Sequence, residues 1–194
     1  MKRRIFLLTI LVFGILSVLI LHRYNQNRIV ATVNGQQITN NDVTNICKQL
    51  DEYEDDYYSK VLNDIIDEYV VVLNADKVNV KVTENEINSC IQEYKDSFPD
   101  IYEKGKKIYG EKEFYKGIEL QIIYNKVYEI VVSEQIENNR ERLVEQFYLT
   151  YNNDHDMEIS REEFISEYET EFDEYIFNLW VDEVKKDMNI IIYK

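Results

Sequence analysis

Chain breakers are scarce in this 194-residue chain, which has one proline, Pro99, and five glycines. Sandwiches and barrels of many short strands need turn residues every few positions, so this scarcity disfavours those folds and favours helices. Hydrophobic residues nevertheless make up 45% of the chain. That share is enough to bury a core, so the composition excludes a largely disordered protein.

Acidic residues are absent from residues 1–41, where five basic residues occur: Lys2, Arg3, Arg4, Arg23 and Arg28. The rest of the chain holds all 37 acidic residues and 22 − 5 = 17 basic ones, a net charge of −20. A surface this acidic repels phosphate backbones, so we expect no nucleic-acid partner. A well-solvated helical surface explains the acidity without any ligand.

Charges are also missing from residues 5–21, which are apolar apart from a threonine, a serine and a glycine. At about 1.5 Å per residue, this run is just long enough to cross the hydrocarbon core of a bilayer. No small-residue cleavage site follows it, and no cysteine for lipid attachment occurs before Cys47. The sequence predicts an uncleaved signal anchor in a single-pass cell-membrane protein, with a cytoplasmic N-terminus and an extracytoplasmic body. The alternative is a cleaved signal peptide and a secreted body.

Two β-rich segments lie near the ends of the remaining chain. Residues 29–39 indicate a strand, an Asn34-Gly35 turn and a second short strand, because Asn-Gly supplies the positive φ angles of a tight hairpin. Residues 190–193 form another β-rich run. We expect it to pair with the strand at residues 29–33 and so close the domain.

Apolar residues at three- and four-residue spacing predict helices between these strands. The predicted helices cover about residues 43–53, 57–75, 83–98, 114–132 and 160–184, and a stripe over 136–148 either continues the fourth or forms a helix after a bend near Ser133. Thr83 and Ser160 each precede a glutamate by three residues, which is the spacing of a capping box. We expect Pro99 to end the third helix and a lysine-rich loop with Gly105 and Gly110 to follow. The predicted fold class is mainly α: a transmembrane helix, then a helical body with a small β element that joins its ends. Residues 1–28 would form the basic tip, anchor and linker, and residues 29–194 one domain.

The segment from Val30 to Thr39, VATVNGQQIT, resembles the opening strand of SurA- and PrsA-type extracytoplasmic chaperones, which reads V-A-x-V-N-G-x-x-I-T before a helix. Residues 62–73 are similar to the family's buried second helix. Residues 75–86 are similar to its connection A-x-K-x-G-I-x-V-T-x-x-E, with Asn79 where a glycine is common. Two later features also fit: Gly110-x-x-x-x-Phe114 before a long helix with Lys126, and a final helix with Trp180 that leads into a strand. The resemblance covers about residues 29–132 and 170–193.

The resemblance implies a SurA-N-like helical domain that binds unfolded or exported polypeptides. It also implies that Trp180 is buried against the first or second helix, on a stripe with Leu179 and Val184. Relatives often insert a glycine-rich parvulin-type prolyl isomerase domain. Here no glycine follows Gly117, and the interval between the matching blocks is too short for that domain. We therefore expect neither isomerase activity nor any enzyme active site, cofactor or metal. The alternative is a structural or assembly protein that binds one dedicated envelope partner.

Two cysteines, Cys47 and Cys90, lie on the apolar faces of predicted helices. In an exported domain they could form a disulfide if those helices touch. Free cysteine is also a common small core residue, so both interpretations stay open. A catalytic thiol is not expected, because no histidine lies nearby in sequence.

Residues 152–163 partly match a calcium-binding EF-hand loop, with oxygen-bearing side chains at positions 1, 3, 5, 7, 9 and 12. Met157 occupies the position that needs glycine, and Asn152 stands where aspartate is usual. A polar loop that ends in the capping box of Ser160 and Glu163 explains the same residues, and we favour it. His22 and His155 lack metal-ligand spacing. The sixteen tyrosines, eight phenylalanines and Trp180 could line a cleft for unfolded polypeptide, although most have the spacing of core residues.

Overall fold

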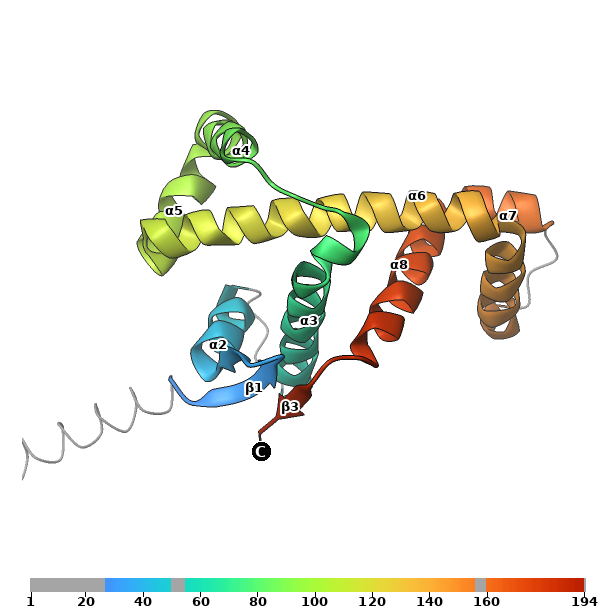
Figure 1. Cartoon of the computed structure of the whole chain (residues 1–194), viewed down its shortest axis with the longest axis horizontal. Helices are drawn as coiled ribbons and strands as arrows, with labels where there is room; N and C mark the ends of the chain where they lie inside the picture. Colours follow the sequence, from blue (N-terminus) through green and yellow to red (C-terminus); the bar gives the residue numbers. More distant parts are fainter. Residues whose placement is uncertain (1–26, 50–54, 156–159, 194) are drawn as a thin grey trace, which may run out of the picture. The chain divides into compact units, whose positions relative to one another are not determined.

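A computed structural model of the chain describes residues 27–49, 55–155 and 160–193 (Figure 1). Within these ranges the fold is mainly helical, with the seven α-helices α2 to α8, the 3-10 helix η1 and three strands. The residues form two compact units. The first comprises the described residues up to Tyr69 together with those from Met188 to Tyr193, and the second comprises the described residues between Val70 and Asp187.

The first unit contains a three-stranded antiparallel sheet with the order β2-β1-β3. Strands β1 (Ile29–Val33) and β2 (Gln36–Thr39) form a hairpin, in which Asn34 and Gly35 have the positive φ angles of 47° and 85°. Strand β3 (Ile190–Ile192) pairs with the other edge of β1. The structure thus confirms the predicted hairpin and the predicted pairing between the two end strands.

Helices α2 (Asn40–Gln49) and α3 (Asp55–Leu73) follow the hairpin. Asp42 accepts hydrogen bonds from the backbone N–H and the hydroxyl of Thr39, at 2.8 and 2.7 Å, which ties the start of α2 to the end of β2. The Tyr58 hydroxyl donates to Asn40 over 2.8 Å and so links α3 to α2. The fully buried side chains of this unit include Val33, Ile38 and Val43.

The second unit is built around one long helix, α6 (Glu111–His155). It begins with the end of α3 and η1 (Ala75–Val78), after which Asn79 has a left-handed φ of 58°. Asparagine and glycine are the residues that adopt this conformation most readily. Helices α4 (Glu84–Ser97) and α5 (Pro99–Tyr109) pack on the N-terminal part of α6. Helices α7 (Arg161–Glu167) and α8 (Glu169–Lys185) pack farther along it.

Aromatic rings fill the core between α6, α7 and α8. The ring of Phe147 lies 5.5 Å from that of Phe164 and 5.4 Å from that of Phe172, between centroids. Toward the other end of α8, Phe177 lies 5.4 Å from Tyr124. Helix α8 thus contacts α6 in two places, around Phe147 and around Tyr124.

The predicted fold class and localisation both need correction. The expected membrane span, residues 5–21, lies outside the described residues. In the ranges that the structure does describe, no helix combines the length and the apolar character needed to cross a bilayer. Helix α6 is long enough, but charged residues interrupt it throughout. The structure therefore supports a mainly helical fold with a small three-stranded sheet, and it does not support a single-pass membrane protein.

Two predicted elements also differ from the structure. The expected lysine-rich loop after Pro99 is helix α5, and the expected final helix from residue 160 is two helices that meet at Tyr168. The stripe over residues 136–148 continues α6 without a break, which was one of the two alternatives. Trp180 is only half-buried and stacks on Phe177, and Leu179 is exposed, whereas Val184 is buried as predicted.

Candidate functional site

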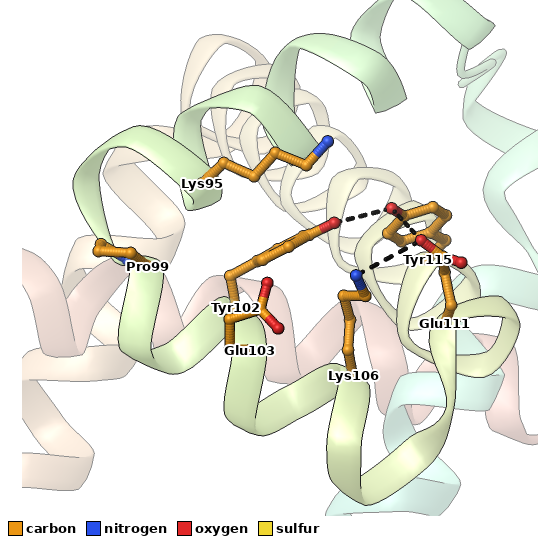
Figure 2. Close-up of a pocket in the computed structure, with 7 residues that line it drawn as sticks. All are labelled: Lys95, Pro99, Tyr102, Glu103, Lys106, Glu111 and Tyr115. Atoms are coloured by element: carbon orange, nitrogen blue, oxygen red, sulfur yellow. Dashed lines mark hydrogen bonds and ion pairs between the residues drawn. The ribbon is translucent and has the colours of Figure 1, made fainter.

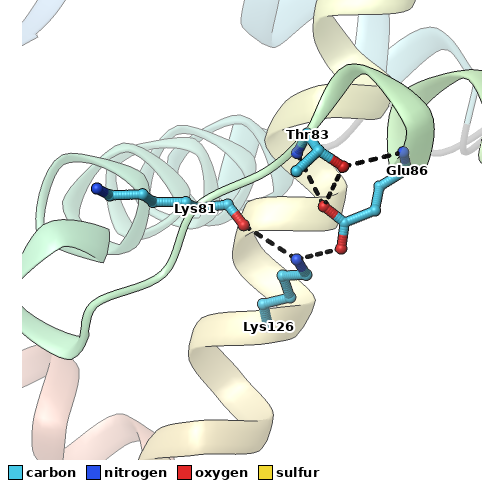
Figure 3. Close-up of polar contacts among 4 residues, drawn as sticks. All are labelled: Lys81, Thr83, Glu86 and Lys126. Atoms are coloured by element: carbon cyan, nitrogen blue, oxygen red, sulfur yellow. Dashed lines mark hydrogen bonds and ion pairs between the residues drawn. The ribbon is translucent and has the colours of Figure 1, made fainter.

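Helix α4 is fastened to α6 by a small polar network (Figure 3). Thr83 and Glu86 form the predicted capping box: the Thr83 backbone N–H donates to the Glu86 carboxylate over 2.8 Å, and the Glu86 N–H donates to the Thr83 hydroxyl over 3.3 Å. Lys126 of α6 pairs with the same carboxylate and donates to the backbone oxygen of Lys81 over 3.0 Å. The hydrogen bonds from Lys126 and Thr83 lower the pKa of Glu86 to about 2.

The space between α4, α5 and α6 is filled by a cluster around Ile91, Tyr102 and Ile118, one buried residue from each helix. The Phe114 ring packs edge-on against Tyr102, with 5.7 Å between centroids. Gly105 of α5 lies directly against Phe114, so that a Cβ atom there would overlap the ring. These contacts hold α5 as a packed helix, although a glycine in its interior weakens its intrinsic helical preference.

A pocket of about 410 Å³ opens between these helices (Figure 2). Its lining residues are Lys95, Pro99, Tyr102, Glu103, Lys106, Glu111 and Tyr115. At its end, the Tyr102 and Tyr115 hydroxyls are 2.8 Å apart, and Tyr115 donates to Glu111 over 2.9 Å. The hydrogen bonds with Tyr102 and Glu111 raise the pKa of Tyr115, which keeps this phenol protonated.

Two ammonium groups lie near the ring of Tyr102 in this pocket: Lys95 at 5.4 Å and Lys106 at 4.9 Å from its centroid. Lys106 also lies 3.6 Å from Glu111. The lining thus combines two cations, two carboxylates and two phenols. Such a lining can hydrogen-bond to polar backbone and side-chain groups, and its formal charges cancel.

Other side chains on and next to α5 are apolar and exposed. They are those of Phe98, Ile101, Ile108 and Tyr109, which are between 40% and 57% exposed. We call these four residues the α5 apolar face. Their spacing of three, seven and one residues places them along one side of the helix. Exposed apolar residues that occur singly are normal, but a set along one helix marks a candidate interaction surface.

The charge around the α5 apolar face differs from that of the chain as a whole. Residues 95–116 contain six lysines and five acidic residues, whereas the chain carries a net charge of −15. A partner with acidic groups would meet less repulsion here than over most of the molecule.

The cysteines predicted as candidates occur in different units as free thiols, Cys47 buried and Cys90 half-buried. The open alternative of a disulfide is therefore not realised in the structure. Burial, with the nearby charge of Glu93, raises the pKa of the Cys90 thiol, which disfavours the thiolate that a nucleophile needs.

The EF-hand-like segment is only partly described, because residues 156–159 lie outside the described ranges. Its first residues belong to α6, which extends to His155. At its other end, Ser160 and Glu163 form the predicted capping box, with the Ser160 hydroxyl donating to Glu163 over 2.7 Å. Among the residues that the structure covers, no group of three or more histidine, cysteine or acidic side chains is arranged to hold a metal ion.

The α5 apolar face does not follow from the predicted loop between Pro99 and Phe114, which the structure shows as helix α5. Two signals point to it in retrospect. Pro99 is well suited to the first turn of a helix, where its missing N–H is not needed. Apolar residues then recur at positions 98, 101, 102, 108 and 109, the spacing of one helix face. The two glycines and four lysines between Pro99 and Phe114 instead favour a loop, and the loop was the prediction.

Comparison with known proteins adds no assignment: the chain matches no protein-family model, and no curated protein matches it.

Proposed function

We propose that this protein is a chaperone-like module of the SurA/PrsA type that binds unfolded polypeptides through the α5 apolar face and has no prolyl isomerase activity. The observation that carries the proposal is the exposure of four large apolar side chains, three on α5 and one at its N-cap, where the helix itself is packed against α4 and α6. Unfolded chains differ from folded ones in exposing apolar side chains, so such a face favours them.

The pocket that α5 lines together with α4 and α6 supports the same function. Its phenols, ammonium groups and carboxylates offer both donors and acceptors to a polypeptide backbone or to polar side chains. A helix that offers both exposed apolar side chains and mixed polar groups suits sequences of varied composition better than one specific ligand. The resemblance to SurA- and PrsA-type chaperones is consistent with such binding.

The absence of isomerase activity is proposed from the interval in which relatives carry a parvulin domain. Here the described part of residues 133–170 is occupied by α6, α7 and the start of α8. The expected result is that the protein does not accelerate cis-to-trans exchange at X-Pro bonds, which takes tens of seconds or longer without a catalyst. A prolyl peptide assay with the full chain measures this, and catalysis above background would contradict the proposal.

Aggregation assays test the binding function. The full chain should suppress the aggregation of several unrelated unfolded proteins, and the double substitution Ile101→Ser with Ile108→Ser should abolish most of this effect. Leu149→Ser is the matched control, because Leu149 is 52% exposed but lies on α6, apart from the α5 apolar face. Equal loss in both variants would contradict a specific role for α5. Protection of a single client among many would instead indicate a protein with one dedicated partner.

A further inference from the structure

Strand β3 lies at the outer edge of the sheet, because β1 separates it from β2. Its register with β1 places Ile190 opposite Val33, Ile191 opposite Thr32 and Ile192 opposite Ala31. Among the described residues, no further strand pairs with the outer side of β3.

The hydrogen bonds of this ladder show which backbone groups of β3 point outward. Asn34 donates to the carbonyl of Asn189 over 2.9 Å, and Tyr193 donates to the carbonyl of Val30 over 2.9 Å. In an antiparallel pair, bonded and non-bonded residue pairs alternate. Residues 189, 191 and 193 therefore direct their N–H and C=O groups toward β1, and Ile190 and Ile192 direct theirs away from it.

The side chains of this edge are apolar and accessible. Ile191, Ile192 and Tyr193 are 42%, 54% and 45% exposed. Proteins usually protect such an edge with charged residues, proline or a bulge, and the sequence from Asn189 to Tyr193 contains neither a charge nor a proline. The edge thus offers unpaired backbone groups together with apolar side chains.

We propose that the outer edge of β3 binds an extended segment of another polypeptide, which adds to the sheet as a fourth strand. The partner is recognised by its backbone, through the N–H and C=O groups of Ile190 and Ile192, and by apolar side chains that pack beside Ile191 and Ile192. This inference rests on the proposed function, since an unfolded client supplies such segments.

Charge determines which polypeptide fits best. A second copy of this chain would bring another net charge of −15 to the interface, and the repulsion disfavours it. A neutral or basic apolar segment meets no such repulsion. Only two residues of β3 direct backbone groups outward, so the binding is weak and reversible, which suits transient holding of a client.

A short peptide of alternating valine and threonine with a terminal lysine pair is the probe. Its addition to the full chain should slow hydrogen exchange at the amides of Ile190 and Ile192, and should change the amides of Ile191 and Tyr193 little. Two N-methylated versions of the peptide provide the control. Methylation of the alternate amides on the peptide edge that faces β3 should abolish binding. Methylation of those on the opposite edge of the peptide should preserve it. Unchanged exchange at Ile190 and Ile192 would overturn the proposal, as would equal binding of both methylated peptides.

Substitutions in β3 give an independent test. Ile192→Pro removes an outward N–H and leaves the hydrogen bonds to β1 intact. It should weaken peptide binding roughly tenfold, because the peptide loses one hydrogen bond and meets the proline ring. Ile191→Pro is the matched control, because it removes an N–H that faces β1 and should destabilise the sheet itself. Undiminished binding in a folded Ile192→Pro variant would overturn the proposal, and the methylated peptides decide the matter if that variant does not fold.

Two results separate this site from the proposed function. If Ile192→Pro still suppresses aggregation, and the peptide does not slow amide exchange in β3 of the wild-type chain, the strand site is wrong and the proposed function stands. If the wild-type chain suppresses no aggregation but the peptide protects β3, the function is wrong and the strand site stands. Sedimentation that shows dimers, lost in Ile192→Pro, would assign the edge to a second copy and overturn the proposed partner.

Discussion

At the scale of single residues, the described part of the second unit depends most on aromatic rings that are buried completely. Phe164 has no exposed surface, and its ring contacts those of Phe147, Tyr148, Tyr151 and Tyr168. Trp180, by contrast, is half-buried and stacks on Phe177 alone among the described rings. We therefore expect Trp180 to contribute less than Phe164 to the free energy of unfolding, although its side chain is larger, because this contribution follows the buried apolar area.

Phe164→Ala should lower the free energy of unfolding by about 3–5 kcal/mol, because it leaves a large cavity among four rings. Trp180→Ala should lower it by a smaller amount, since part of the indole already contacts solvent. Urea denaturation followed by far-UV circular dichroism measures both changes. A loss for Trp180→Ala equal to that for Phe164→Ala would show that the indole is buried after all.

The Glu86–Lys126 pair predicts a pH dependence of stability. The hydrogen bond from Lys126 lowers the pKa of Glu86 from 4.5 to about 2. A carboxyl whose pKa is lower in the folded state stabilises the fold above its unfolded pKa and loses this effect as the pH falls through the folded one. The stability difference between wild type and Glu86→Gln should therefore be present at neutral pH and should disappear between pH 4.5 and about 2.

Denaturation at a series of pH values checks this prediction, with Glu93→Gln on the same helix as the control. Added salt should also reduce the difference, because the pair is partly exposed. A difference that does not change across the acid range would show that Glu86 acts only through its uncharged capping geometry.

At the scale of elements, helix α5 depends on contacts with α6 more than on its own sequence. Gly105 in its interior is unfavourable for a helix, but it allows the close approach of Phe114. Gly117 of α6 has no atom near the position where a Cβ would lie. The two glycines thus form a matched pair, one required by packing and one not.

Gly105→Ala should destabilise the protein by roughly 1 kcal/mol or more, because overlap with Phe114 outweighs the gain in helix propensity. Gly117→Ala should stabilise it by about 0.5–1 kcal/mol, because only the propensity changes. Thermal melting of the two variants against wild type measures both signs. Stabilisation by Gly105→Ala would show that α5 is not held against Phe114.

At the scale of the whole molecule, the sheet of the first unit joins residues that lie far apart in sequence. The side-chain oxygen of Asn34 accepts a hydrogen bond from the backbone N–H of Asn189 over 2.8 Å, and β3 completes the ladder. The central strand β1 therefore pairs with β2, its neighbour in sequence, on one side and with the distant strand β3 on the other.

Truncation after Lys186 should remove β3 and leave β1 paired with β2 alone. By the alternation of the ladder, the amides of Thr32 and Asn34 should lose protection from hydrogen exchange, whereas those of Ala31 and Val33, which face β2, should keep more of theirs. The melting temperature should fall, since ladder bonds and apolar contacts are lost. A truncated chain that melts as cooperatively and as high as the full chain would contradict a structural role for β3.

Features that depend on residues within a few positions of each other follow from the sequence alone. The capping boxes at Thr83 and Ser160 and the Asn34-Gly35 hairpin are all found where the pattern predicts them. Each is decided by hydrogen bonds or φ angles of a single turn, so the local sequence contains all the necessary information. The pairing of β1 with β3 was also predicted, because β-rich runs near both ends of a helical chain leave few other partners.

Features that depend on contacts between residues far apart in sequence could be read only from the folded chain. Residues 99–109 are helical because Tyr102 and Gly105 pack against α6, and Trp180 is half-buried because Phe177 takes the inner position on α8. The membrane span expected from hydropathy finds no counterpart in the described residues, whose long helices carry charges along their length. The α5 apolar face and the open edge of β3 are likewise set by packing. Periodicity shows which residues share a side of a helix or strand, but whether another element covers that side depends on contacts made elsewhere in the fold.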